Sequence, residues 1–260
     1  MTALAPHITA FFRQRLPLER MASPHTCDSY AYAFRLLFAF ASRRLRMPPS
    51  ALQLENIDAK MVLAFLEDLQ SSRTNGARTR NARLTAIKSF MHFVEHRVPG
   101  AIEQIRRVLA IPNQKTDQRL IDHLDAQQCQ AILDAPDPTT RPGIRDRAML
   151  HVCITAGLRV SELVGLQLGD VTFTARYVDL RVRGKGRKER ILTLWKAVAG
   201  SIQAWLAVRG KPSVAALFLN ARGSEMTRAG FEYLLRKHVA DARTRCPTLR
   251  VHCHGATRSP

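Results

Sequence analysis

The stretch Thr155-Ala156-Gly157-Leu158-Arg159-Val160-Ser161-Glu162-Leu163 decides the fold of the second half of this chain. Apolar residues before it recur with a helical period over 143–156, and Gly157 stands where a left-handed residue would end that helix. Arg159 is therefore expected at the turn that follows. Glu162, three residues later, is expected on the same face of the next helix.

Arg159 has the chemistry needed to hold a phosphodiester. A guanidinium stays charged in proteins and matches two phosphate oxygens with parallel hydrogen bonds. It can therefore hold the negative charge that develops when a phosphodiester becomes pentacoordinate, and Glu162 is placed to orient it. The alternative interpretation is an ordinary surface arginine that follows a glycine.

The sequence after this turn predicts a β-hairpin with a basic tip. From Val171 the pattern changes to a period of two, in which Val178, Leu180 and Val182 alternate with polar residues. Lys185 stands between two glycines, so its ammonium could reach into a groove and protonate a leaving oxygen. The alternative is a basic turn that makes ordinary backbone contacts. The hairpin residues predicted to contact phosphates are Arg183, Arg187, Lys188 and Arg190.

The first half of the chain predicts a small bundle of helices. Apolar residues recur at steps of three and four over 26–45, Asp58 is placed to cap a second helix, and Asn81 precedes a third. Basic residues gather beside the ends of these helices. A solvated face explains them as well as phosphate contact does. The residues of this group that are predicted to contact phosphates are Arg78, Arg80, Arg83 and Lys88.

An irregular segment divides the chain into two predicted domains. Residues 113–120 have no apolar period and follow a proline, which indicates an inter-domain linker. Asp125, with Gln128 three residues later, resembles a capping box that begins the second domain. The predicted domains are 1–112, all helical, and 121–260, helical with the hairpin. The predicted fold class is mainly α with a small antiparallel β-hairpin or sheet.

Length and charge narrow the classes of function. The chain has 260 residues, 46% of them hydrophobic, which is enough for two globular domains with cores. A net charge of +19 favours a polyanionic partner such as nucleic acid over a merely basic protein. The sequence lacks a long apolar run and a signal pattern, and its five scattered cysteines fit reduced thiols. We therefore expect a cytoplasmic protein with no membrane partner.

Two motifs resemble those of a known family. The segments Ala156–Leu163 and Gly184-Lys185-Gly186-Arg187-Lys188-Glu189-Arg190 look like the first arginine box and the lysine hairpin of the tyrosine recombinases, the phage-integrase family. The helical first half, with Asn81-Ala82-Arg83-Leu84-Thr85-Ala86-Ile87-Lys88-Ser89-Phe90, is similar to the core-binding domain of that family. The likeness extends from about residue 8 to about residue 245.

This resemblance implies a fold, a reaction and partners. Residues 1–112 would be a helical, SAM-like DNA core-binding domain, and 121–260 an α+β integrase-type catalytic domain. In that family a tyrosine attacks the scissile phosphate and forms a 3′-phosphotyrosyl link, without a metal or nucleotide cofactor. Carried over by motif, Arg159 would be the first catalytic arginine, Glu162 its supporting acid and Lys185 the general acid. The resemblance also implies duplex DNA as partner and a tetramer of protomers on paired sites.

The end of the chain departs from the family pattern. The family continues with a His-x-x-Arg box and then the tyrosine nucleophile, but His254 and Arg258 are four residues apart. The tyrosines, which all precede this tail, are Tyr30, Tyr32, Tyr177 and Tyr233. Losing the nucleophile removes the covalent intermediate itself. We therefore expect a catalytic domain that is truncated at its C-terminus and that binds DNA with strand cleavage lost.

Three interpretations remain open. The first is a DNA integration and recombination protein by ancestry that no longer cleaves. The second is a catalytically inactive module that binds DNA and occupies recombination sites. The third keeps activity with a tyrosine supplied in trans by another protomer. A zinc site made by Cys246 with 252–254 is disfavoured because adjacent side chains in an irregular tail rarely converge on one ion, so we predict no metal and no other cofactor.

Overall fold

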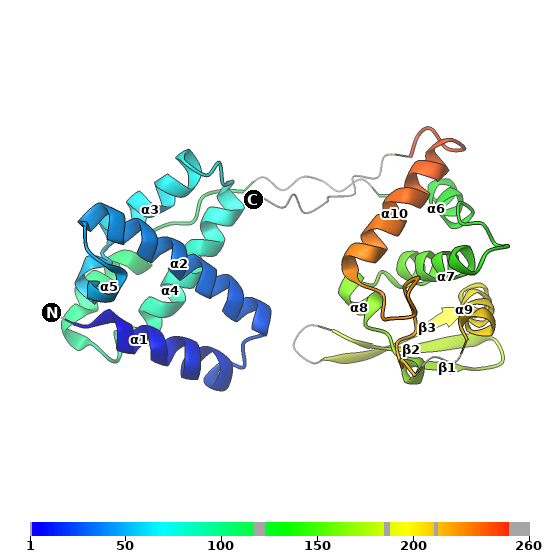
Figure 1. The fold of residues 1–260 in the computed structure, drawn as a ribbon, viewed down its shortest axis with the longest axis horizontal. Helices are drawn as coiled ribbons and strands as arrows, with labels where there is room; N and C mark the ends of the chain where they lie inside the picture. Colours follow the sequence, from blue (N-terminus) through cyan, green and yellow to red (C-terminus); the bar gives the residue numbers. More distant parts are fainter. Residues whose placement is uncertain (1, 117–122, 185–187, 211–212, 250–260) are drawn as a thin grey trace. The chain divides into compact units, whose positions relative to one another are not determined.

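The structure, a computed structural model, describes residues 2–116, 123–184, 188–210 and 213–249 (Figure 1). The chain divides into two compact units between Arg119 and Leu120, and each unit has its own hydrophobic core. Helices and one small antiparallel sheet make up the two units, so the predicted fold class is confirmed. The predicted linker, 113–120, lies partly outside the described residues.

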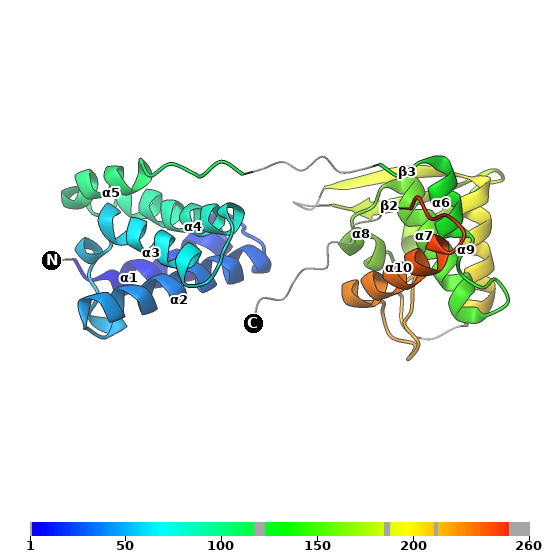
Figure 2. The ribbon, with the colours of Figure 1, turned by 90° about the horizontal axis from the view of Figure 1, so that it is seen from above.

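The first unit is a helical bundle with a core rich in phenylalanine. Helix α4 lies against α2, α3 and α5 (Figure 2). The rings of Phe11, Phe34 and Phe90 are buried and meet edge to face, with centroids 5.4 to 6.2 Å apart. The elements of this unit are α1 (Leu4–Ala10), η1 (Phe11–Glu19), α2 (Pro24–Leu45), η2 (Pro49–Ala51), η3 (Leu54–Asn56), α3 (Ala59–Ser71), α4 (Ala77–Glu95), η4 (Pro99–Ala101) and α5 (Ile102–Leu109).

Capping side chains fix where two of these helices begin. At the start of α2, the Thr26 N–H donates to Ser23 Oγ at 3.2 Å. At the start of α3, the Met61 N–H donates to Asp58 Oδ1 at 2.7 Å, which confirms the predicted cap. Each cap satisfies an N–H group that has no partner inside the helix.

The third predicted helix begins earlier than expected. Asn81 lies inside α4, which starts at Ala77 after Gly76, so the prediction that Asn81 precedes this helix was wrong. Asn81 Nδ2 instead donates to the Gln114 carbonyl at 2.7 Å, and the Gln114 N–H donates to Asn81 Oδ1 at 3.0 Å. The Asn81 side chain therefore holds the segment that follows α5.

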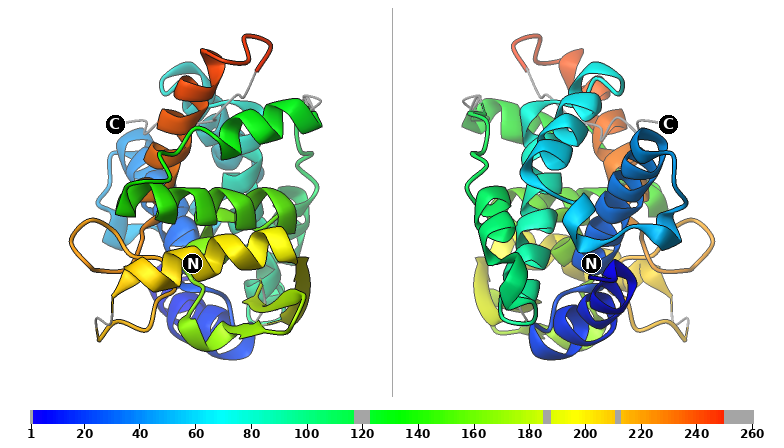
Figure 3. Two further views of the ribbon diagram at one scale, coloured as in Figure 1. Left: turned by 90° about the vertical axis from the view of Figure 1, so that its right-hand side faces the viewer. Right: turned by 90° about the vertical axis from the view of Figure 1, so that its left-hand side faces the viewer.

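The second unit packs helices against a three-stranded antiparallel sheet of order β1-β2-β3. Helix α9 lies against β2 and β3, and α7 lies beside α9 (Figure 3, left). Helix α10 packs against α6 and α8. The elements of this unit are α6 (Ala126–Leu133), α7 (Arg141–Ala156), α8 (Val160–Val164), η5 (Leu168–Asp170), β1 (Val171–Phe173), β2 (Tyr177–Arg183), β3 (Glu189–Trp195), α9 (Lys196–Arg209) and α10 (Arg228–Arg243).

The predicted hairpin is formed by β2 and β3, which pair in one register along their whole length. Tyr177 lies opposite Trp195 at one end, and Arg183 lies opposite Glu189 at the other. Alternate residues of β2 are buried, as the period of two predicted, because successive strand residues face opposite sides of the sheet. Arg183, Lys188 and Arg190 all lie at the Arg183 end of the hairpin, which is called its basic end below.

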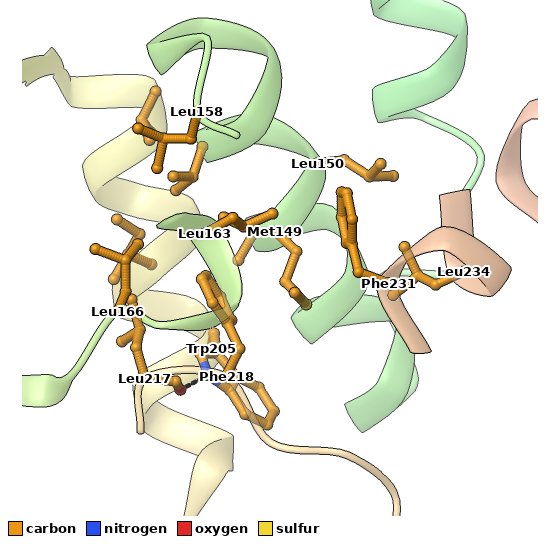
Figure 4. Close-up of a cluster of buried hydrophobic side chains, with 14 of the residues drawn as sticks. Met149, Leu150, Leu158, Leu163, Leu166, Trp205, Leu217, Phe218, Phe231 and Leu234 are labelled. Carbon is orange, nitrogen blue, oxygen red and sulfur yellow. Dashed lines mark hydrogen bonds between the residues drawn. The ribbon is translucent and has the colours of Figure 1, made fainter. Parts of the chain in front are cut away.

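One apolar cluster joins the helices and the sheet of the second unit (Figure 4). Trp205 on α9 is fully buried, and its Nε1 donates to the Leu217 carbonyl at 2.8 Å, so the polar atom of the ring is satisfied. Met149 of α7 and Phe231 of α10 lie in the same cluster. This core is what holds the junction between α7 and α8 in place.

Candidate functional site

Arg159 is held at a helix junction by the residues on each side of it. Helix α7 ends at Gly157, whose φ of 58° is left-handed and turns the chain, as predicted. Leu158 and Leu163 are both buried in the core of the second unit (Figure 4). The backbone of Arg159 is thus anchored, while its side chain is 70% exposed.

A buried carboxylate fixes the direction of this side chain. The Glu162 side chain is only 4% exposed, and its Oε2 accepts the Arg159 backbone N–H at 3.0 Å. Its Oε1 accepts Arg159 Nη1, also at 3.0 Å. The first bond satisfies the start of α8 in the manner of a capping box. The second uses one N–H of the guanidinium, whose other donors have no partner within the described part of the chain.

A second arginine, Arg190 of β3, binds the same carboxylate through two parallel hydrogen bonds. Arg190 Nη1 lies 3.2 Å from Glu162 Oε1, and Arg190 Nη2 lies 2.9 Å from Glu162 Oε2. The bonds from Arg190 are the main cause that lowers the pKa of Glu162 to about 2, and the bonds from Arg159 add to them against the opposing effect of burial. The same contact raises the pKa of Arg190.

The pairing of Arg190 with Glu162 was not predicted from the sequence, which placed Arg190 among the DNA contacts. Arg190 lies opposite Val182 and is in phase with Leu192 and Leu194 on β3. Residues two apart on a strand share a face, so this alternation already directs Arg190 to the core side of the sheet. That signal indicates an inward side chain but does not identify Glu162 as its partner, whereas contact of Arg190 with DNA stays a prediction.

The tip of the hairpin begins beside the cluster formed by Arg159, Glu162 and Arg190. The Gly184 N–H donates to the Lys188 carbonyl at 2.8 Å and closes the strand ends. A Cβ added to Gly184 would lie 3.2 Å from Arg190 Nη1 and 3.4 Å from Glu162 Oε1. Because Gly184 has no side chain, the backbone of the hairpin can lie close to the Glu162 carboxylate and to the Arg190 guanidinium.

Four of the predicted hairpin cations remain to be placed, and two of them, Lys185 and Arg187, lie outside the described residues. Lys188 and Arg183 are both exposed at the basic end. Arg183 Nε donates to Glu189 Oε1 at 3.2 Å, and its Nη2 lies 3.7 Å from the buried carboxylate of Asp170.

The predicted DNA contacts of the first unit have different surroundings. Arg78 is exposed and Lys88 is half-buried. Arg80 is buried, and its Nη1 lies 3.3 Å from Asn81 Oδ1 and 3.4 Å from the Pro112 carbonyl, both of which accept from it. Arg80 thus holds the segment after α5, and of these three residues only Arg78 is exposed.

Arg83, the fourth member of this set, is half-buried against α2. Its Nη1 donates to the Ser29 carbonyl at 3.2 Å, and its Cζ lies 4.8 Å from the centre of the Tyr32 ring. Arg35 Cζ lies 4.9 Å from the same ring centre. Burial lowers the pKa of Arg83.

The four tyrosines are distributed over both units. Tyr30 and Tyr32 lie on α2 in the first unit, and Tyr233 is exposed on α10. Tyr177 begins β2, at the end of the strand away from Gly184, and a strand of this length spans about 20 Å at ~3.3 Å per residue. In the described ranges no tyrosine hydroxyl is hydrogen-bonded to Arg159 or Glu162.

A second buried ionic cluster, which the sequence did not predict, joins α7 to α10. His238 Nε2 lies 2.9 Å from Asp146 Oδ2, and Arg145 donates to Asp146 Oδ1 from Nε at 2.9 Å and from Nη2 at 2.7 Å. The side chains of all three residues are largely buried. Asp146 and His238 thus bond α7 to α10.

Among the described residues, no three His, Cys, Asp or Glu side chains are grouped so that they could hold a metal ion. The tail considered for zinc, 252–254, lies outside these residues, and Cys246 is buried. The helices of the described ranges are too short or too polar to cross a bilayer.

Comparison with protein families gives two matches that together span most of the chain. Residues 122–259 match the model of the phage integrase family, and residues 8–97 match the phage integrase N-terminal SAM-like domain. The first range contains Arg159, Glu162 and Arg190, and the second contains α2, α3 and α4.

Relatives and a solved structure agree with these matches. The putative integrase/recombinase y4rC of Sinorhizobium fredii is 43% identical over 97% of this chain and 76% of its own length. The tyrosine recombinase XerC of Pelobacter propionicus is 35% identical over 92% of this chain and 76% of its own. The XerH site-specific recombinase bound to difH substrate in a pre-cleavage complex superimposes with a TM-score of 0.63 at 21% identity, over 90% of this chain and 65% of the XerH chain. This chain therefore spans slightly less than two thirds of that recombinase.

Proposed function

This chain belongs to the phage integrase family of tyrosine recombinases, and from that premise we propose that its 260 residues bind duplex DNA and take part in site-specific recombination. One observation carries the proposal: the Arg159 guanidinium is bonded on one side to a buried carboxylate and is exposed on the other. A phosphodiester is the partner that such a fork of donors matches best.

Arg159 and Lys185 would divide the work on the scissile phosphate. Arg159 would hold the non-bridging oxygens, which gain negative charge as the phosphorus becomes pentacoordinate. Lys185 would give a proton to the leaving 5′ oxygen. The close approach of Gly184, the residue before Lys185, to Glu162 supports this pairing of roles.

The nucleophilic tyrosine is not identified among the residues that the structure describes. Cleavage in this family needs a tyrosine oxygen on phosphorus, and no tyrosine in the described ranges bonds to Arg159 or Glu162. A tyrosine supplied in trans by another protomer would complete the site, which agrees with the tetramer on paired sites that the family resemblance implies. Integration or recombination would then need at least one further protomer at each cleaved strand.

A second candidate function is a catalytically inactive module that occupies recombination sites. The net charge of +19 and the exposed side chains of Arg78, Arg183 and Lys188 serve binding and need no strand cleavage. This module would compete with complete recombinases for the same duplex.

Two experiments separate these functions. The full chain is first used to select its site from a random duplex library, and binding is then measured by gel shift. Failure to retain any duplex at low salt would contradict the DNA-binding proposal. The selected site is next prepared as a nicked suicide substrate. A covalent protein–DNA band from the pure chain would show that its own residues supply the nucleophile.

Mixing tests the trans mechanism. The chain is combined on the suicide substrate with a complete relative in which alanine replaces the first catalytic arginine. A covalent band that requires both proteins, and that disappears with Arg159→Ala in this chain, supports a tyrosine in trans acting on the Arg159 site. Absence of the band with wild-type Arg159 supports the inactive module.

A further inference from the structure

Glu162 has more hydrogen-bond donors around it than orientation of Arg159 requires. An ionised carboxylate has two oxygens that can each accept about two hydrogen bonds. In this structure all of that capacity is used: Arg159 contributes its backbone N–H and Nη1, and Arg190 contributes Nη1 and Nη2. The Arg190 guanidinium makes two hydrogen bonds to Glu162, one to each oxygen, whereas the Arg159 guanidinium makes one.

This division of bonds determines what Arg159 can do. A guanidinium beside a buried carboxylate gains most by turning both of its parallel donors towards it. Arg190 already occupies that arrangement, so Arg159 keeps one bond to Glu162 and presents the rest of its donors to solvent, with 70% of its side chain exposed. We infer that Arg190 is a positioning residue: by filling the carboxylate of Glu162 it prevents capture of the Arg159 guanidinium and leaves that guanidinium free to bind a phosphate.

The packing of the hairpin supports this inference. Arg190 is the second residue of β3 and lies on the same face as Leu192 and Leu194, and its Nη1 would lie 3.2 Å from a Cβ on Gly184. Glycine at position 184 leaves room for the Arg190 side chain to pass the end of β2 and reach Glu162. The inference rests on the proposed function only where it takes the bound phosphate to be one of DNA. The arrangement of Arg159, Glu162 and Arg190 is present without DNA.

The test uses the full chain and inorganic phosphate as the probe. The Arg159 Nε–Hε signal in a proton–nitrogen NMR spectrum, identified by its loss in Arg159→Lys, is followed while phosphate is added. Wild-type protein should show a saturable shift of this signal. Arg190→Gln should weaken the apparent phosphate affinity at Arg159 by about fivefold to tenfold, because Arg159 then turns towards Glu162. Arg190→Lys keeps the charge without the fork and should fall between the two.

Arg181→Gln is the matched control. Arg181 is also an exposed hairpin arginine bonded to a buried carboxylate, since its Nε lies 3.2 Å from Asp170 Oδ1. Its loss removes the same charge without touching Glu162, so the phosphate response of Arg159 should stay within about twofold of wild type. An equal loss in the Arg181 and Arg190 variants would show a general charge effect and overturn the inference.

Three further outcomes test the positioning role of Arg190. If Arg190→Gln does not fold, Arg190→Lys is used alone, and a response equal to that of the wild type overturns the inference. An Arg159 signal that does not respond to phosphate in the wild type overturns it as well. If the Arg190 dependence holds while no duplex is retained in the gel shift, the positioning role stands and the DNA-binding proposal fails.

Discussion

Arg190 Nη2 lies 2.9 Å from Glu162 Oε2, and this contact bonds the start of β3 to helix α8, 28 residues earlier in the chain. Because Glu162 also bonds to Arg159, the hairpin and the α7–α8 junction share one buried carboxylate. The position of the candidate phosphate-binding arginine therefore depends on the sheet as well as on its own helix.

Glu162→Gln is expected to change how the free energy of unfolding depends on pH. The pKa of Glu162 falls from 4.5 to about 2 on folding, so its carboxylate contributes stability above pH ~4.5 that is lost as pH falls towards 2. The variant lacks this contribution, so its free energy of unfolding should be lower at neutral pH and should change less between pH 5 and pH 3. Urea unfolding at several pH values measures this. Glu225→Gln, which removes an exposed acid whose side chain is not bonded to Arg159 or Arg190, should retain the wild-type pH dependence.

Gly157→Ala is expected to destabilise the junction before Arg159. Gly157 has a φ of 58°, and an alanine there would cost about 1–2 kcal/mol although there is space for its Cβ. Gly200→Ala is the matched control, because Gly200 lies within α9 with nothing near its Cβ position, and alanine there should stabilise by about 0.5–1 kcal/mol. Thermal unfolding of both variants tests the prediction, and shifts of the same sign would contradict it.

Asp146→Asn is expected to weaken the packing of α7 against α10. The variant leaves Arg145 without its charged partner in a largely buried site, at a cost of about 3 kcal/mol. Asp134→Asn removes an exposed partner of Arg147 and should cost less than about 1 kcal/mol. Denaturant unfolding compares the two. A similar small effect of both substitutions would show that the buried cluster contributes little.

Arg78→Gln and Arg80→Gln are expected to act in different ways on the first unit. Arg78 is exposed, so its loss should reduce the slope of log affinity against log salt for duplex DNA by about one phosphate contact and leave stability unchanged. Arg80 is buried and bonded to the Pro112 carbonyl, so its loss should lower the unfolding temperature. Binding titrations in a salt series, with thermal unfolding beside them, measure both effects. The assignment fails if Arg80→Gln changes the salt slope without any loss of stability.

Periodicity and capping patterns were sufficient to predict most of the fold. The stripes of α2 and α3, the caps at Asp58 and Asp125, the turn at Gly157 and the alternation of β2 are all properties of residues close together in the chain. Asn81 was wrongly placed before its helix, which begins at Ala77; its side chain bonds to the backbone of Gln114, 33 residues later, a contact that local sequence does not indicate.

The candidate site was predicted only in part, for a related reason. Arg159 and Glu162 are three residues apart, so one helix turn brings them together. Arg190 reaches Glu162 from a separate strand, and Asp146 meets His238 across 92 positions. Neither contact follows from local spacing, although the phase of Arg190 with Leu192 and Leu194 already indicated an inward side chain.

The proposed contact of Arg159 with one backbone phosphate is tested most directly by removing the charge of that phosphate. Duplexes that carry the selected site are made with a single neutral methylphosphonate at each linkage in turn, and the affinities of the wild-type chain and of Arg159→Ala are compared. We predict one linkage at which neutralisation weakens wild-type binding about tenfold and leaves Arg159→Ala unaffected. Equal losses in both proteins at every linkage would contradict the account.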